Sequence, residues 1–115
     1  MNLPRHTVIN EVALMRFKSK RHNKITMDRI GKVVSQDASI PLSEIKSKNR
    51  EIPLPELRQV ILYLGRENKA GSMDKIASYI GQKHDYTNYS VIQVNNRMDT
   101  DKDFKNMVDR IKKKL

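Results

Sequence analysis

The chain has 115 residues, of which 37% are hydrophobic, and its 23 Lys and Arg against 13 Asp and Glu give a formal charge of +10. This length suggests one domain with a modest core, and the absence of cysteine excludes disulfides, cysteine-based zinc sites and a thiol nucleophile. No segment approaches the roughly 18 apolar residues of a membrane span, and the N-terminus lacks the apolar run of a secretory signal, so we expect a cytoplasmic protein.

The first 24 residues form a basic N-terminal extension with six cations and one anion, which is half of the net charge of the chain. The spacing of Val8, Val12 and Met15 predicts a short amphipathic helix before the densest basic run, residues 16–24. A positive charge of this size favours nucleic acid as the partner, ahead of an anionic membrane or an acidic protein. We expect residues 25–115 to form the folded domain.

Apolar residues recur at helical spacing along residues 25–115, whereas strand signals are poor. A first helix is predicted to begin after Thr26 as N-cap and to end before Ile40-Pro41, because a residue before proline avoids the helical region. A short helical turn over Leu42–Lys46 follows. Pro53 and Pro55 then mark the start of a longer helix that ends near residues 68–71, since proline is tolerated only in the first helical turn.

Three further helices are expected in the second half of the chain. Ser72 can cap a helix that Gly81 ends in the left-handed conformation. A polar stretch, residues 82–88, precedes a helix with Val91, Val94 and Met98 on its inward face. Thr100, with Asp103 three residues later, resembles a capping box that opens the last helix. The fold predicted is therefore all-α, a compact domain of five or six helices.

Two neighbouring helices of this set have the outline of a helix-turn-helix, with Ala77 four residues before Gly81 and with Val91 and Val94 facing inward. The N-terminal end of the second helix of this motif faces base edges in the major groove. Hydrogen-bonding side chains crowd that position here, from Lys83 to Ser90. The alternative is a polar loop with ordinary capping residues.

A second group of cations precedes the longer helix. Lys46, Lys48 and Arg50 lie in an expected loop, and Arg58-Gln59 follow near a helix start. Such loops suit phosphates or a narrow minor groove, whose negative potential attracts Arg and Lys. Taken alone, a solvated loop accounts for these residues equally well.

These two stretches carry a family resemblance. Residues 46–52 (KSKNREI) and 58–67 (RQVILYLGRE) resemble the C-terminal DNA-binding domain of the bacterial replication initiator DnaA, which has a basic loop Ser-Arg-Lys-Arg-Glu-Ile followed by Arg-Gln-Ile-Ala-Met-Tyr-Leu-Ala-Arg-Glu. The similarity continues through residues 72–76, 79–81, 91–93 and 101–104. It covers about residues 24–115 and implies the helix-turn-helix fold of DnaA domain IV, which is related to that of TrpR.

The resemblance also implies roles for individual residues. In that family the basic loop enters the minor groove, which assigns that role to Lys48 and Arg50, although this chain has two extra residues within 53–57. The positions that hold phosphates in the family correspond to Arg58, Gln59 and Arg66 and to the helix start at Ser72 and Met73, while Gln93 replaces a phosphate-binding His. Lys46 of the expected loop completes the predicted phosphate contacts.

The base-contacting motif departs from the family pattern, because the distance from Gly81 to Val91 is three residues longer. Aligned from Gly81, the residues expected to contact bases are Lys83, His84 and Asp85. Aligned from Val91, they are Thr87, Asn88, Tyr89 and Ser90. We favour the second alignment, because it places the Ser90 hydroxyl where it can reach the groove. It also includes Asn88, whose side-chain amide can both donate to and accept from adenine.

The sequence lacks the phosphate-binding loop of an ATPase, and 115 residues could not hold that domain beside this one. We therefore predict a sequence-specific module for double-stranded DNA, associated with the nucleoid, in replication initiation or transcription regulation, with other replication or regulatory proteins as further partners. No enzymatic activity, cofactor, metal, small-molecule substrate or membrane is expected. The alternatives are a helical adaptor for an acidic protein partner and a protein that binds structured RNA.

Overall fold

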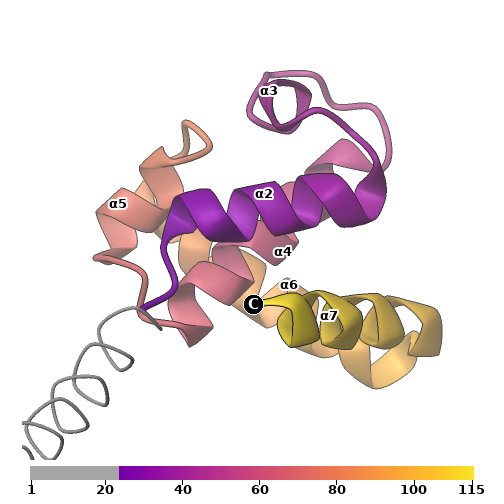
Figure 1. Cartoon of the computed structure of the whole chain (residues 1–115). Coiled ribbons are helices and arrows are strands. Elements are labelled where there is room, and N and C mark those ends of the chain that lie inside the picture. The colour runs from indigo at the N-terminus through magenta and orange to yellow at the C-terminus, as the bar shows by residue number, and fades with distance from the viewer. Residues whose placement is uncertain (1–23) are drawn as a thin grey trace, which may run out of the picture.

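The computed structural model describes residues 24–115, so the helix expected before residue 16 and the extension up to residue 23 lie outside the described part. Within it the structure is all-helical, as predicted, and holds no strand (Figure 1). The helices, in chain order, are α2 (Met27–Ala38), α3 (Leu42–Ile45), α4 (Leu54–Glu67), α5 (Met73–Ser78), α6 (His84–Thr100) and α7 (Lys102–Lys114).

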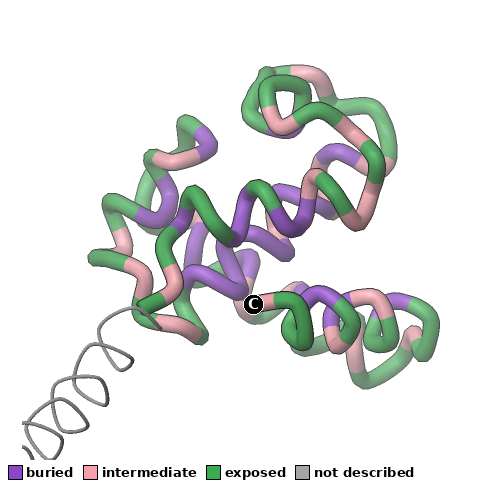
Figure 2. Tube along the Cα trace, viewed as in Figure 1, coloured by how far each residue is buried: buried purple, intermediate pink, exposed green. Residues whose placement is uncertain are grey.

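Helix α4 forms the centre of the core. Its residues from Val60 to Leu64 are buried, and α2, α3, α5 and α6 all pack against it. Figure 2 shows the buried positions concentrated on α4 and on the sides of the surrounding helices that face it. Five consecutive residues of a helix point to all of its sides, so the middle of α4 is covered all round and positions the elements that cover it.

Local sequence signals set several helix boundaries as predicted. The side chains of Thr26 and Ser72 accept hydrogen bonds from the backbone N–H groups of Arg29 and Lys75, each at 3.2 Å, and so cap α2 and α5. Pro53 is the N-cap of α4, and Gly81 adopts the left-handed conformation with φ +75°. These signals act within a few residues, which is why the sequence alone discloses them.

Two boundaries differ from the prediction. Helix α6 begins at His84 rather than after Asn88, so the three extra residues add almost a full helical turn instead of a loop. Helix α7 is capped by Asp101 and not by Thr100, which is the last residue of α6. The Asp101 carboxylate accepts a 3.0 Å hydrogen bond from the N–H of Phe104, and this bond, helped by Arg97, lowers the pKa of Asp101.

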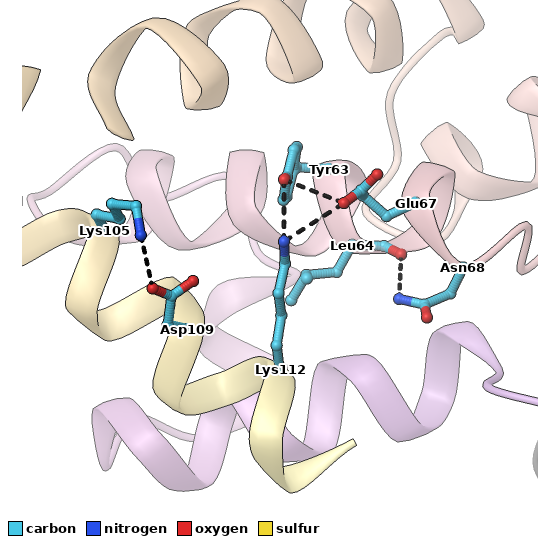
Figure 3. A network of polar contacts seen from close by, with 7 residues as sticks. All are labelled: Tyr63, Leu64, Glu67, Asn68, Lys105, Asp109 and Lys112. Carbon is cyan, nitrogen blue, oxygen red and sulfur yellow. Dashed lines mark hydrogen bonds and ion pairs between the residues drawn. The ribbon is translucent and has the colours of Figure 1, made fainter. Parts of the chain in front are cut away.

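Polar contacts tie α7 to the rest of the domain. Figure 3 shows Lys112 of α7 reaching Tyr63 and Glu67 of α4, at 3.2 and 3.3 Å from Nζ. Burial opposes the charge of Lys112, but the bonds to Tyr63 and Glu67 outweigh it and raise the pKa of the lysine. Within residues 24–115, none of the helices combines the length and apolar character needed to cross a bilayer.

Candidate nucleic-acid interface

The segment between α3 and α4, residues 46–52, is called the basic loop here. Its short polar side chains hold its own backbone: the Ser47 hydroxyl accepts a hydrogen bond from the N–H of Asn49, and the side-chain oxygen of Asn49 accepts one from the N–H of Glu51 at 3.0 Å. Lys48 and Arg50 alternate with these residues and are exposed. The turns thus leave both cations at the surface, as the sequence predicted.

Arg58 of α4 supports the basic loop from inside. It is only 7% exposed, and its side chain donates to the carbonyl oxygens of Ile45 and Ser47 at 2.6 and 2.7 Å. These bonds supply donors to carbonyl groups that have no partner within α3, and they fix the position of the start of the basic loop. The expected role of Arg58 in holding phosphate stays a prediction: two of its guanidinium nitrogens donate to the protein itself, while the residue also lines the cleft described below.

Lys46, the first cation of the basic loop, rests on an aromatic ring. Its Nζ lies 4.2 Å from the centroid of the Tyr79 ring, and the Tyr79 hydroxyl donates to Asp28 at 3.3 Å. Burial, with the nearby Asp28 carboxylate, raises the pKa of Tyr79 to about 12. A Cβ at Gly31 would collide with the Tyr79 hydroxyl, so glycine lets α2 accept the ring that positions Lys46.

Helices α5 and α6 form the helix-turn-helix. Ala77 is fully buried where the two helices meet, and the chain turns from Tyr79 to Gly81 through successive hydrogen bonds. The hydroxyl of Thr87 donates to the Met73 carbonyl at 3.4 Å, and His84 Nδ1 lies 3.4 Å from Asp74. The beginnings of α5 and α6 are therefore adjacent.

The start of α6 presents residues from both sequence alignments. His84 and Asp85 from one, and Asn88 and Tyr89 from the other, are exposed, with Lys83 exposed as the N-cap. His84 Nε2 lies 2.9 Å from the Asp85 carboxylate. One additional helical turn brings the two sets onto the same stripe of α6, because residues three and four apart share a face.

Thr87 and Ser90 do not belong to that stripe. Both are fully buried, with Val94, on the side of α6 that faces the core. The structure thus removes their hydroxyls from the predicted base contacts, including the Ser90 hydroxyl on which the favoured alignment depended. Their small size suits the close contact of α6 with α4 and α5, a tertiary constraint with no local signal in the sequence.

One cleft joins the basic loop to the helix-turn-helix. Its lining combines four cationic residues of the loop and α4 with the turn that precedes α6; the lining residues are Lys46, Ser47, Lys48, Arg50, Arg58, Ile80, Gly81 and Gln82. Figure 1 shows both segments at the upper edge of the view, on the side away from α7. The basic loop and the turn that leads into α6 therefore line one cleft, and the predicted base-contacting residues of α6 follow directly after that turn in the chain.

The other expected phosphate contacts occupy two places. Arg66, at the end of α4, reaches the Met73 sulfur at 2.9 Å, so it lies beside Ser72 and the adjacent starts of α5 and α6. Gln59 and Gln93 are half-buried on α4 and α6. Sequence reasoning missed Gln82, a lining residue of the cleft, and Asp74, whose carboxylate lies beside His84. The position of Asp74 in a first helical turn indicated only an ordinary helix-end charge.

The sequence of this chain matches one family of known proteins. Residues 27–93, from the start of α2 into α6, match the model of the bacterial dnaA protein helix-turn-helix. The chain is similar to three proteins named chromosomal replication initiator protein DnaA: it is 33% identical to that of Campylobacter concisus over 97 residues, 32% to that of Campylobacter curvus over 100, and 32% to that of Flavobacterium psychrophilum over 101. These matches cover 84%, 86% and 87% of this chain but 22%, 23% and 21% of the relatives, so the chain spans about a fifth of their length. The chain therefore belongs to the family of bacterial DnaA helix-turn-helix domains.

Proposed function

We propose that this chain binds double-stranded DNA sequence-specifically through the surface around the cleft. The start of α6 lies in the major groove, with base contacts from His84, Asp85, Asn88 and Tyr89. Lys48 and Arg50 enter the adjacent minor groove, as the family resemblance implies. The observation that carries the proposal is the cleft itself, because it brings exposed cations and the turn before α6 onto one face.

The charges on this face suit the proposal. Lys46, Lys48 and Arg50 are exposed and form no ion pair with the described residues, whereas Arg110 and Lys114 are paired with Asp37 and Arg97 with Glu56. Phosphate contacts position a protein on duplex DNA and base-edge contacts specify the sequence. A face with both groups can do both. Replication initiation and transcription regulation remain the processes we propose for such a module.

Selection from a randomised duplex library with the full chain tests the proposal. We expect one enriched consensus with a fixed reading frame. On that site, Lys48→Ala and Arg50→Ala should weaken binding of matched and scrambled duplexes alike. Lys113→Ala, an exposed lysine of α7 that does not line the cleft, is the matched control and should bind as the wild type does.

Other outcomes would favour the alternatives. Equal binding of double-stranded RNA of the same length would argue against a helix in the major groove, since the A-form major groove does not admit one. Failure to bind duplex DNA even at low salt, together with capture of an acidic protein, would favour an adaptor.

A further inference from the structure

An apolar side chain stands at the middle of the outward stripe of α6. Ile92 is 57% exposed, and Tyr89, three residues earlier, is 51% exposed; neither belongs to the residues that pack on the core. The rest of that stripe is polar, with Asp85 and Asn88 before Ile92. Single exposed apolar residues are common on proteins, so exposure alone does not indicate a function for Ile92. The residues around it have to supply that argument.

The packing of α6 fixes the direction of Ile92. Thr87, Ser90 and Val94 are buried against the core. Val94 follows Ile92 by two residues, which is a little over half a turn of helix, so the two side chains point in roughly opposite directions. Asn88 precedes Ile92 by four residues and lies on the same face. Ile92 thus extends, by one turn, the stripe that begins beside the cationic cleft.

The neighbouring aromatic ring is held in place. The Tyr89 ring lies 5.8 Å from the ring of Tyr86, centroid to centroid, and Tyr86 packs against the core. Tyr89 and Ile92 therefore form a small apolar surface on an otherwise polar stripe. The major groove offers one apolar group to such a surface, the C5-methyl group of thymine.

We infer that Ile92 is a specificity-determining residue that contacts a thymine methyl group in the major groove. The inference rests on the proposed function, since it requires the outward stripe of α6 to face DNA. Four residues of helix span about 6 Å, so the thymine lies roughly one or two base pairs from the base that Asn88 contacts. The family resemblance assigned no role to this position.

Deoxyuridine provides the test, because it differs from thymidine only in lacking the methyl group. In the selected duplex, each thymine is replaced singly by deoxyuridine, and affinity for the full chain is measured by fluorescence anisotropy. For the wild type we expect one position at which loss of the methyl group weakens binding about three- to tenfold. For Ile92→Ala the same replacement should have no effect, while the unfolding midpoint stays unchanged because the side chain is exposed.

The matched control is Ile52→Ala, which shortens an isoleucine that is 89% exposed in the basic loop. It should leave the difference between thymine and uracil intact. If the wild type discriminates at no position, or if Ile92→Ala keeps the discrimination, the inference is overturned although the chain still binds DNA. Loss of discrimination in Tyr89→Ala alone would assign the methyl contact to Tyr89 and overturn it too. Absence of binding to any duplex would instead contradict the proposed function.

Discussion

Arg58 organises the basic loop although its own side chain is buried beneath it. Its guanidinium is buried below the basic loop and donates to two carbonyl groups, one at the end of α3 and one in the loop. Planar, forked donors of this kind suit two acceptors at once, which the single ammonium of lysine does not. The exposed positions of Lys48 and Arg50 depend on this support.

Replacing Arg58 should therefore affect stability as well as binding. Arg58→Ala removes the donor of the buried Ile45 carbonyl and of the exposed Ser47 carbonyl, and we expect the free energy of unfolding to fall by about 1–3 kcal/mol. Arg58→Lys should recover only part of this loss. Urea denaturation of both variants gives the measurement, with Lys113→Ala as the surface control. Wild-type stability in Arg58→Ala would show that the guanidinium is free to serve phosphate instead.

Ser90 and Asn88 lie two residues apart on α6 and should behave in opposite ways. The buried Ser90 hydroxyl has no hydrogen-bond partner among the described residues, whereas Asn88 is exposed. Ser90→Ala should leave base preference unchanged and raise stability by up to about 1 kcal/mol, since it removes an unsatisfied polar group. Asn88→Ala should keep stability and reduce discrimination between bases by about 1–3 kcal/mol. Competition binding measures base preference and urea denaturation measures stability for both variants. An altered base preference in Ser90→Ala would contradict the placement of Ser90 away from the bases.

At the scale of elements, the turn between α5 and α6 depends on Gly81. Its φ is +75°, and a Cβ built there would meet no atom within 4 Å. A larger residue at Gly81 is therefore disfavoured by the left-handed backbone conformation and not by a steric clash.

Gly81→Ala should lower the free energy of unfolding by about 1–2 kcal/mol. Gly71→Ala is the matched control, because Gly71 is exposed and lies outside the left-handed region; its Cβ would come to 3.3 Å from the Cβ of Lys75, a flexible exposed side chain. Thermal unfolding of the two variants tests the difference. Equal midpoints would mean that the turn adopts another conformation.

The pairing of α2 with α7 gives an acid-sensitive contact. The Asp37 side chain is only 5% exposed and accepts from Arg110 at 2.7 and 2.8 Å and from Lys114 at 3.2 Å. The hydrogen bond from Arg110, joined by Lys114, holds the pKa of Asp37 below its usual value. A lowered pKa means that the contact stabilises the fold above about pH 4 and that this contribution is lost as pH falls through the pKa of the folded state.

Asp37→Asn should thus destabilise the protein at pH 7, and its difference from the wild type should shrink as the pH falls through the lowered pKa of the wild-type carboxyl. Urea denaturation at a series of pH values from 7 downward measures this. The exposed pair Lys105–Asp109 offers Asp109→Asn as a control with a smaller effect at pH 7, because exposed ion pairs contribute little. If the wild type and Asp37→Asn still differ in stability at low pH, the carboxylate is not the source of the difference.

For the whole molecule, net charge and surface charge have different consequences. The +10 charge attracts any polyanion, but only cations on the surface that we propose to face DNA would displace counterions from phosphates.

If six to eight phosphates are neutralised, the logarithm of affinity should fall with the logarithm of salt concentration with a slope of roughly −5 to −7. Lys48→Ala should make the slope shallower by about one, whereas Asn88→Ala should leave it unchanged. A salt titration of binding to the selected duplex gives all three slopes. Equal slopes in wild type and Lys48→Ala would place Lys48 outside the interface.

The sequence by itself determined the features that arise within a few residues or from total charge. Thr26 and Ser72 cap the helices that follow them, and proline is tolerated only in the first turn of α4. Gly81 adopts a left-handed backbone conformation that glycine allows irrespective of distant residues. The fold class also follows from the helical spacing of apolar residues, and the family resemblance from the sequences of residues 46–52 and 58–67.

Only the tertiary structure decided which side of each polar segment is buried. Thr87 and Ser90 differ little in chemistry from an exposed neighbour such as Asn88, yet the packing of α6 on α4 and α5 buries them. Arg58 becomes internal because α3 covers it, and Ile92 becomes external because Val94 faces the core. The rotation of a helix about its axis depends on contacts between residues far apart in the chain, so the local sequence does not specify it.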